Sequence, residues 1–265
     1  MKPSLIVSGA AGRMGQRILA LAAESKQFTI VAALEREDHP DLGKDAGLVA
    51  GIGELGVILQ HSHNDTADVM IDFSLPEAAE HSIDFCIDNK VGLIMGTTGL
   101  TGDHQALLRR AAEHIPVIYG TNMSVGMNVL FYIVGKVAAM LGDAYDIEIV
   151  EQHHRFKKDS PSGSALSLAA SICKATGRSF PDCLVHGRQG KETLRTAGTI
   201  GMHAIRGGDI TGEHSVIFST LGETVRIEHS AHNRDNFVRG ALRAALWLTG
   251  KPAGQYSMAE VLGIK

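Results

Sequence analysis

A glycine-rich turn between an apolar strand and a helix is the feature that most constrains the fold of this chain. Residues 5–7 (Leu-Ile-Val) predict a short buried strand, and the apolar spacing over residues 18–22 predicts a helix. Gly9, Gly12 and Gly15 lie between them, in a GxxGxxG spacing instead of the commoner GxGxxG. In such a turn the first glycine permits the tight bend, the second lets the backbone approach a pyrophosphate, and the third allows close packing of helix and strand. The turn therefore predicts a dinucleotide-binding domain.

An acidic residue at the end of the second expected strand supports this interpretation. Residues 29–34 predict a strand that ends directly on Glu35 and Arg36, about 20 residues after the turn, as such domains require. Glu35 would accept hydrogen bonds from ribose hydroxyls, which favours NAD, whereas Arg36 and Arg13 could pair with a 2′-phosphate, which favours NADP. With both kinds of residue present, we expect the protein to use either NADH or NADPH. A solvated Arg36 in a charged surface run is an equally good interpretation of that residue.

Strands alternate with helices up to about residue 123, which predicts a parallel α/β sheet with right-handed crossovers. Two further turns, at residues 96–99 (Gly-Thr-Thr-Gly) and 120–123 (Gly-Thr-Asn-Met), follow expected strands. Ligands of open α/β sheets bind at the carboxyl ends of strands, so we expect both turns to contact the nicotinamide. The predicted cofactor-binding residues are Gly9, Ala10, Ala11, Gly12, Arg13, Met14, Glu35, Arg36, Gly96, Thr97, Thr98, Gly120, Thr121, Asn122 and Met123.

The pattern changes after Ser124, where one long expected helix (residues 125–141) is followed mainly by short strands. That run of strands predicts a second, α+β domain with a mixed or antiparallel sheet. We expect the last helix, at residues 237–249, to pack back onto the first domain. The expected division is residues 1–124 and 234–265 for dinucleotide binding, and residues 125–233 for substrate binding.

Residues 151–165, Glu-Gln-His-His-Arg-Phe-Lys-Lys-Asp-Ser-Pro-Ser-Gly-Ser-Ala, place two histidines and two lysines before an expected helix start. Pro161 suits the first helical turn, and residues 162–164 would offer backbone N–H groups to an anion that the helix dipole also favours. His153 and His154 would point to opposite sides of a regular strand, so both serve one site only if the chain turns there. The segment predicts a site for a small substrate with more than one negative charge.

Composition excludes several other classes of function. The net charge of −4 provides no basic face for nucleic acid. Polar and glycine residues interrupt the apolar run at residues 125–141, which argues against a membrane span. The first residues lack a signal-peptide pattern, and three cysteines fit a reducing compartment, so we expect a cytoplasmic protein. We expect no metal site, because no HExxH or CxxC pattern accompanies the paired histidines.

The chain resembles the dihydrodipicolinate reductase family over essentially its entire length. The resemblance implies reduction of a hydroxy-tetrahydrodipicolinate to tetrahydrodipicolinate with NADH or NADPH, in the diaminopimelate pathway to lysine. It also implies a homotetramer joined through the second domain. The motifs that carry the resemblance are residues 9–15, 96–99, 151–165, 206–210 (Arg-Gly-Gly-Asp-Ile), 212–214 (Gly-Glu-His), 240–242 (Gly-Ala-Leu) and 256–258 (Tyr-Ser-Met).

The resemblance also implies individual roles. His153 would be the proton donor or acceptor, Lys157 the general acid and His154 a substrate ligand, and Gly163 with Ser164 would hold one substrate carboxylate. Which of His153 and Lys157 delivers the proton stays open, since coupled groups can titrate as a unit. The family more often has Asp-Ala-Pro-Ser-Gly-Thr at residues 159–164. Ser164 keeps the hydroxyl and the N–H, so we expect binding to survive, with Ser160 or Asp159 capping the helix.

Two alternatives remain at this stage. A semialdehyde or homoserine dehydrogenase would share the first domain, but the semialdehyde enzymes need a nucleophilic cysteine, and none lies at an evident helix start or beside a base. An NAD(H)-binding redox sensor would need no proton donor and would more typically carry a basic DNA-binding face. The sequence does not explain residues 206–209 and 213–214, which could form part of a pocket, a subunit contact or a plain strand–turn–strand element.

Overall fold

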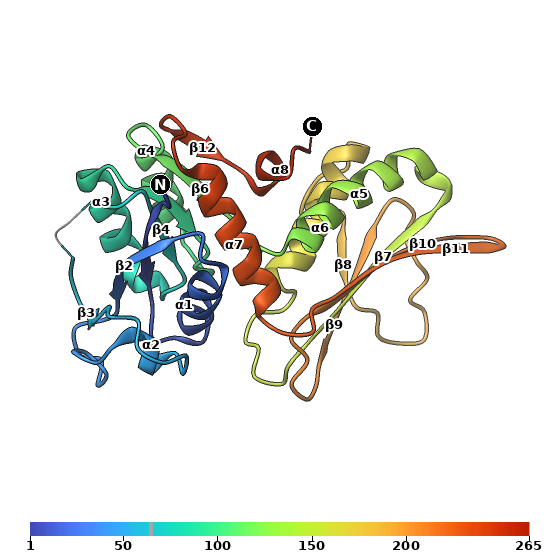
Figure 1. Cartoon of the computed structure of the whole chain (residues 1–265). Helices are drawn as coiled ribbons and strands as arrows, with labels where there is room; N and C mark the ends of the chain where they lie inside the picture. The colour runs from blue at the N-terminus through green and yellow to red at the C-terminus, as the bar shows by residue number, and fades with distance from the viewer. Residues whose placement is uncertain (64–65, 265) are drawn as a thin grey trace. The chain divides into compact units, whose positions relative to one another are not determined.

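The computed structural model describes residues 1–63 and 66–264. They form two compact units (Figure 1). Unit 1 comprises residues 1–125 and the segment that begins at Arg234, and unit 2 comprises Gly126–Asn233. Each unit has its own sheet and its own apolar core.

Unit 1 contains a parallel sheet of seven strands in the order β12-β6-β5-β4-β1-β2-β3. Successive apolar residues of β1 point to opposite sides: Leu5 and Val7 enter one core, and Ile6 enters the other. A sheet that is buried on both faces is what a parallel arrangement needs. The strands are β1 (Ser4–Ser8), β2 (Thr29–Leu34), β3 (Leu59–Gln60), β4 (Val69–Asp72), β5 (Gly92–Met95), β6 (Pro116–Tyr119) and β12 (Gly254–Tyr256).

Helices cover both faces of this sheet (Figure 1). α1 and α7 pack together in one core, while α3 and α4 pack in the other. β1 lies between β2 and β4, so the strand order reverses there, at the position where open α/β sheets bind ligands. The helices of unit 1 are α1 (Arg13–Ser25), α2 (Ala46–Val49), the 3-10 turn η1 (Pro76–Ala78), α3 (Ala79–Asn89), α4 (Gly102–Ala111), α7 (Asp235–Leu248) and α8 (Met258–Val261).

Unit 2 contains a mixed sheet of five strands in the order β11-β10-β7-β9-β8, which confirms the predicted second α+β fold. β7 pairs with β10 antiparallel and with β9 parallel. α5 and α6 share one core with this sheet. The elements are α5 (Val125–Leu141), the 3-10 turn η2 (Gly142–Ala144), β7 (Asp146–His153), α6 (Gly163–Thr176), β8 (Leu184–His186), β9 (Ile200–Arg206), β10 (Glu213–Thr220) and β11 (Glu223–Ser230).

The helix α5 is long and apolar enough, by length and composition alone, to cross a membrane. Met127, Leu130, Val134 and Ala138 recur at helical spacing and pack into the core of unit 2. A core helix satisfies the same criteria of length and composition.

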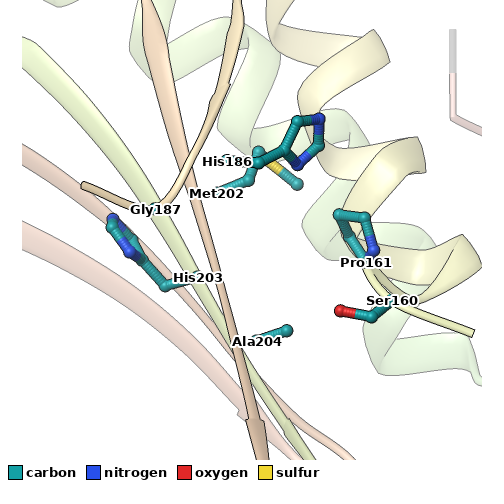
Figure 2. Close-up of a pocket in the computed structure, with 7 residues that line it drawn as sticks. All are labelled: Ser160, Pro161, His186, Gly187, Met202, His203 and Ala204. Carbon is teal, nitrogen blue, oxygen red and sulfur yellow. The ribbon is translucent and has the colours of Figure 1, made fainter. Parts of the chain in front are cut away.

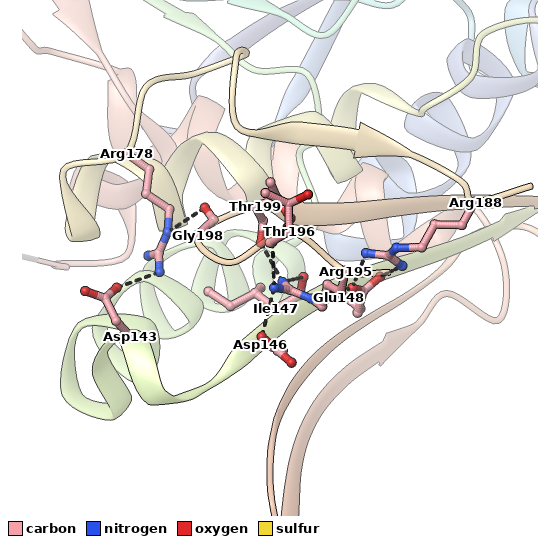
Figure 3. A network of polar contacts seen from close by, with 10 residues as sticks. All are labelled: Asp143, Asp146, Ile147, Glu148, Arg178, Arg188, Arg195, Thr196, Gly198 and Thr199. Atoms are coloured by element: carbon pink, nitrogen blue, oxygen red, sulfur yellow. Dashed lines mark hydrogen bonds and ion pairs between the residues drawn. The ribbon is translucent and has the colours of Figure 1, made fainter. Parts of the chain in front are cut away.

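A polar network holds residues 187–199 against the sheet of unit 2 (Figure 3). Its centre is Glu148 on β7, whose carboxylate lies directly over Gly201 of β9, where any side chain would overlap it. Arg188 and Arg195 donate to this carboxylate at 2.8 and 3.1 Å, and His203 Nε2 lies 2.7 Å from it. Burial by itself would raise the pKa of Glu148, but these hydrogen bonds lower it to about 2.

Replacing Glu148 by Gln removes the charge that these three side chains share. We expect the free energy of unfolding at pH 7 to fall by about 1–3 kcal/mol, less than the full pKa difference implies because the network is partly solvated. The folded pKa, about 2, lies below the ordinary 4.5. The stabilisation is therefore present above pH 4.5 and is lost as the pH falls toward 2. Urea unfolding at pH 7 and pH 3 measures both effects.

Glu192→Gln is the matched control, because Glu192 is exposed on the same segment. We expect it to change the free energy of unfolding by less than about 0.5 kcal/mol. An equal loss in the two variants, or a Glu148→Gln deficit that does not shrink at pH 3, would contradict the role given to Glu148.

Candidate active site

The glycine turn of unit 1 is set by steric limits. Gly9 has φ +72°, and a Cβ there would lie 2.8 Å from the carbonyl oxygen of Phe73. A Cβ on Gly15 would overlap the carbonyl oxygen of Gly9, and one on Gly12 would lie 3.2 Å from the same atom. Glycine at positions 9 and 15 therefore lets the turn bring the start of α1 close to β1, and glycine at position 12 leaves backbone exposed for a phosphate group.

Glu35 lies beside this turn. Its Oε2 accepts a hydrogen bond from the Ala11 N–H at 3.1 Å, and its Oε1 accepts one from the Arg36 N–H at 3.1 Å. The acid that the sequence placed at the end of β2 thus contacts the glycine turn directly. The Arg36 side chain instead extends into solvent and pairs with Asp38 at 3.2 Å.

The loops after β5 and β6 carry the remaining predicted cofactor residues at the same edge of the sheet. Thr97 is buried and donates its hydroxyl to Asp72 Oδ1 at 2.6 Å, so its side chain holds the loop instead of facing solvent. Asn122 Oδ1 accepts from the Ser124 N–H at 2.8 Å. Met123 is also buried, and its carbonyl lies where a side chain on Gly240 of α7 would stand.

Two residues of this edge were not identified from the sequence. Asp72 ends β4 and accepts from Thr97 and from Ser82, while the Phe73 ring fills the space where a side chain on Gly96 would lie. The sequence signal that could have identified Asp72 is an acidic residue at the end of an otherwise apolar strand. The structure gives Asp72 a task in holding the loops together.

The His–Lys segment of unit 2 begins where β7 ends. His153 is the last residue of the strand and is buried, and the chain then turns, with the Lys157 N–H donating to the His154 carbonyl at 3.1 Å. This is the turn that both histidines need in order to serve one site. The Lys157 ammonium pairs with Asp159 at 2.9 Å, and its side chain is 21% exposed.

Helix α6 starts at Gly163, two residues later than expected. Ser162 is its N-cap and accepts the Ala165 N–H at 3.2 Å, so the predictions that Pro161 lies in the first turn and that Ser160 or Asp159 caps the helix are wrong. Ser162 has an extended backbone, with φ −66° and ψ 153°, and its N–H donates to Glu151 at 3.0 Å and not to the anion site. Gly163 and Ser164 are consequently the first two helical residues, where backbone N–H groups point toward an anion.

Three further polar residues adjoin His153. Glu151 is 1% exposed and lies 2.5 Å from His153 Nδ1, and Arg206 pairs with it at 2.7 Å. Burial would raise the pKa of Glu151, but the hydrogen bonds from His153, Arg206 and Ser162 lower it to about 2. His214 packs edge-on against His153, with 5.2 Å between the ring centroids. Burial lowers the pKa of His214 to about 3. No role was assigned to any of the three from the sequence.

A cavity of about 540 Å³ lies beside β8 and β9 (Figure 2). Ser160 and Pro161 form one wall just before α6, but none of the predicted catalytic or substrate residues lines it. Its lining is Ser160, Pro161, His186, Gly187, Met202, His203 and Ala204. Within residues 1–63 and 66–264 no group of three or more His, Cys, Asp or Glu side chains could hold a metal ion.

A parallel sheet with a glycine turn of the nucleotide-binding kind, followed by a mixed sheet whose strand β7 leads into paired histidines and a lysine, is the arrangement of a two-domain oxidoreductase. Residues 3–123 match the family model for the N-terminus of dihydrodipicolinate reductase, and residues 126–262 match the model for its C-terminus. The chain belongs to the dihydrodipicolinate reductase family.

Curated relatives match almost the whole chain. The 4-hydroxy-tetrahydrodipicolinate reductase of Geobacter sulfurreducens is 46% identical, with 98% of this chain and 99% of the relative covered. The enzyme of the same name from Syntrophotalea carbinolica is 43% identical, with 98% of each chain covered. The fold is also that of dipicolinate-bound dihydrodipicolinate reductase from Paenisporosarcina sp. TG-14, with a TM-score of 0.73 at 22% identity over 98% of this chain and 99% of that one.

Alanine substitutions at Gly12 and Gly15 should have different effects, because the space around the two glycines differs. We expect Gly15→Ala to lose at least about 2 kcal/mol of stability, because the new methyl group meets backbone that must shift. Gly12→Ala should fold nearly normally, because its Cβ would lie 3.2 Å from the Gly9 oxygen. It should bind NADH more weakly, because the new methyl group covers backbone that approaches the pyrophosphate. Thermal unfolding and titration of NADH fluorescence measure the two effects.

Gly102→Ala, at the start of α4, is the control, because nothing lies within 4 Å of its Cβ position. We expect it to leave both stability and NADH binding unchanged. Normal stability in Gly15→Ala would show that the close approach of α1 to the turn is not required.

Proposed function

We propose that this chain is a 4-hydroxy-tetrahydrodipicolinate reductase, which uses NADH or NADPH to form tetrahydrodipicolinate in lysine biosynthesis through diaminopimelate. The observation that carries the proposal is the segment from His153 to Ser164, which runs from the end of β7 to the start of α6. It joins titratable side chains to a helix start within twelve consecutive residues. Curated relatives with this activity cover the chain from end to end.

The substrate is a dicarboxylate and needs two anion sites. We assign one carboxylate to Gly163 and Ser164, because the first N–H groups and the dipole of the 14-residue helix α6 favour negative charge. His154 lies in the turn just before and is assigned to substrate binding. The Paenisporosarcina enzyme of the same fold was solved with dipicolinate bound.

The reaction adds a hydride and a proton and releases the substrate hydroxyl as water. The nicotinamide cofactor supplies the hydride when it is bound. The protein must then neutralise the negative charge that develops on the ring, a contribution worth about 10²–10⁴-fold in rate. We assign His153 as the proton donor or acceptor and Lys157 as the general acid. Asp159, 2.9 Å from the Lys157 ammonium, holds that side chain near the turn.

The nucleotide is assigned to unit 1, and either form is expected to bind. The glycine turn leaves backbone for the pyrophosphate, and Glu35 lies beside the turn, where it can meet ribose hydroxyls. The ion pair described for the Arg36 guanidinium is an exposed one, with Asp38. An exposed pair contributes little energy, so the guanidinium can turn to a 2′-phosphate at little cost. We expect comparable turnover with NADH and NADPH.

The assembly is proposed to be a homotetramer formed through unit 2, acting in the cytoplasm. α5 and α6 pack on one side of the mixed sheet, while β11 and the β10–β11 turn expose Leu221 and Val225. Exposed apolar side chains on a sheet favour a protein contact. Sedimentation equilibrium decides the point, because a monomer mass at micromolar concentration would exclude the tetramer.

Two of the three cysteines are poorly suited to be the thiol nucleophile of an enzyme such as a semialdehyde dehydrogenase. Burial raises the pKa of Cys86 well above its ordinary value. Burial and the neighbouring Cys183 raise the pKa of Cys173 to about 12. Both thiols therefore stay protonated at neutral pH, and a protonated thiol is a poor nucleophile.

Lys157→Met tests the reaction and the acid together. We expect kcat to fall by about 10²–10⁴-fold, because the variant lacks the positioned acid, while NADH binding persists in unit 1. The assay follows oxidation of NADH and of NADPH with freshly made hydroxy-tetrahydrodipicolinate, so it also tests use of both cofactors.

Lys158→Met is the matched control, since Lys158 is the exposed neighbour of the same type. It should retain nearly full turnover. No turnover in the unmodified chain despite tight nucleotide binding would overturn the proposed function. Full activity in Lys157→Met would leave the reductase in place and assign the proton to His153.

A further inference from the structure

The carboxylate of Glu151 has all its hydrogen-bonding capacity engaged. Oε2 lies 2.5 Å from His153 Nδ1 and accepts from Arg206 Nη1 at 2.8 Å. Oε1 accepts from Arg206 Nη2 at 2.7 Å and from the Ser162 N–H at 3.0 Å. A carboxylate that is 1% exposed and holds four donors is placed to orient its neighbours, and its charge would repel an anionic substrate.

Arg206 is itself fixed from both sides. It donates to the carbonyl oxygens of Ile205 at 2.7 Å and of Asp159 at 2.9 Å, in addition to its two bonds to Glu151. The guanidinium thus links β9 to the loop before α6 and cannot turn away from the carboxylate without losing several bonds. Bidentate pairing of this kind fixes geometry as well as charge.

These contacts determine which nitrogen of His153 is available. A neutral imidazole whose Nδ1 faces an ionised carboxylate carries its hydrogen on Nδ1 and leaves Nε2 as the acceptor. Gly212 adjoins that second nitrogen, and a Cβ at Gly212 would lie 3.2 Å from it. The missing side chain leaves room beside Nε2 for an atom of a substrate.

The electrostatic surroundings favour proton exchange at this nitrogen. The charges of Glu151 and Arg206 balance each other, so a protonated His153 would give this cluster a net charge of +1, and the adjacent Glu151 carboxylate stabilises that imidazolium by direct attraction. His214, the other ring against His153, is neutral because burial lowers its pKa to about 3. It hydrogen-bonds Ser162 Oγ at 3.3 Å, and the charged residues that follow His153 along the chain are the exposed Arg155 and the Lys157–Asp159 pair.

We propose that Glu151, clamped by Arg206, is a positioning residue that holds His153 in the Nδ1–H tautomer and so directs Nε2 to the substrate. This role rests on the proposed function, in which His153 exchanges a proton. It also gives a purpose to Arg206 and to the Gly212–His214 motif, which the sequence alone left unexplained.

Glu151→Gln tests the proposal, because an amide has only one oxygen. If the NH₂ group of the glutamine took the place of Oε1, it would face two other donors, Arg206 Nη2 and the Ser162 N–H, and could bond to neither. If the NH₂ group took the place of Oε2, it would face only one other donor, Arg206 Nη1. His153 could then carry its hydrogen on Nε2 and accept from the NH₂ group at Nδ1. We therefore expect the variant to switch the His153 tautomer and to lose about 10²-fold in kcat, with NADH binding unchanged.

Nitrogen-15 NMR of histidine-labelled protein reads the tautomer directly, with His153→Gln used to assign the resonance, at a pH where the imidazole is neutral. The unmodified chain must show the hydrogen on Nδ1, and finding it on Nε2 would overturn the proposal even if the variant fails to fold. A Glu151→Gln protein that keeps the Nδ1–H tautomer, or that switches it and retains full kcat, would overturn it as well.

Glu148→Gln is the matched control. It makes the same change on the same strand, at a carboxylate that meets two arginines and a histidine where Glu151 meets one arginine and a histidine, but on the opposite face of β7. It should lose stability and keep both kcat and the His153 tautomer. Absence of reductase activity in the unmodified chain would refute the proposed function, whereas the tautomer measurement needs no substrate and stands alone.

Discussion

The buried ion pair between Glu151 and Arg206 is the interaction on which the geometry of unit 2 depends. It joins β7, β9 and the N-cap of α6, because the same carboxylate accepts the Ser162 N–H. An unpaired carboxylate at this depth would be strongly destabilising, so Arg206 of β9 and the Ser162 N–H must be in place when β7 buries Glu151. The position of His153 and the start of the anion-binding helix follow from this one requirement.

The alternation of side chains along β7 lets one strand carry two separate polar clusters. Glu151 and His153 lie on one face, and Glu148 lies on the other, where it holds residues 187–199 against the sheet. Each cluster uses a glycine of a neighbouring strand or turn: Gly201 gives space to the Glu148 carboxylate, and Gly212 adjoins His153 Nε2. The His153 side chain is therefore held in a fixed orientation although it lies at the end of β7.

Unit 1 positions its loops by a different means. Backbone contacts at Gly9 and Gly15 bring β1, α1 and the loop after β4 together, and side chains would fill that space. Asp72 then ties the neighbouring loop through Thr97. Close packing of backbone sets the nucleotide-binding turn, while electrostatics sets the proposed catalytic segment.

Local patterns in the sequence determined most of the elements. The strands at residues 29–34 and 116–119 and the helix at residues 125–141 were predicted to the residue, because apolar periodicity and flanking turn residues are local properties. The tertiary structure alone decided the start of α6 and the purpose of Arg206. Arg206 meets Glu151 across 55 residues, and Ser162, the N-cap of α6, donates its N–H to the same carboxylate. The register of β7 against β9 brings Arg206 to Glu151, and no local pattern encodes that register.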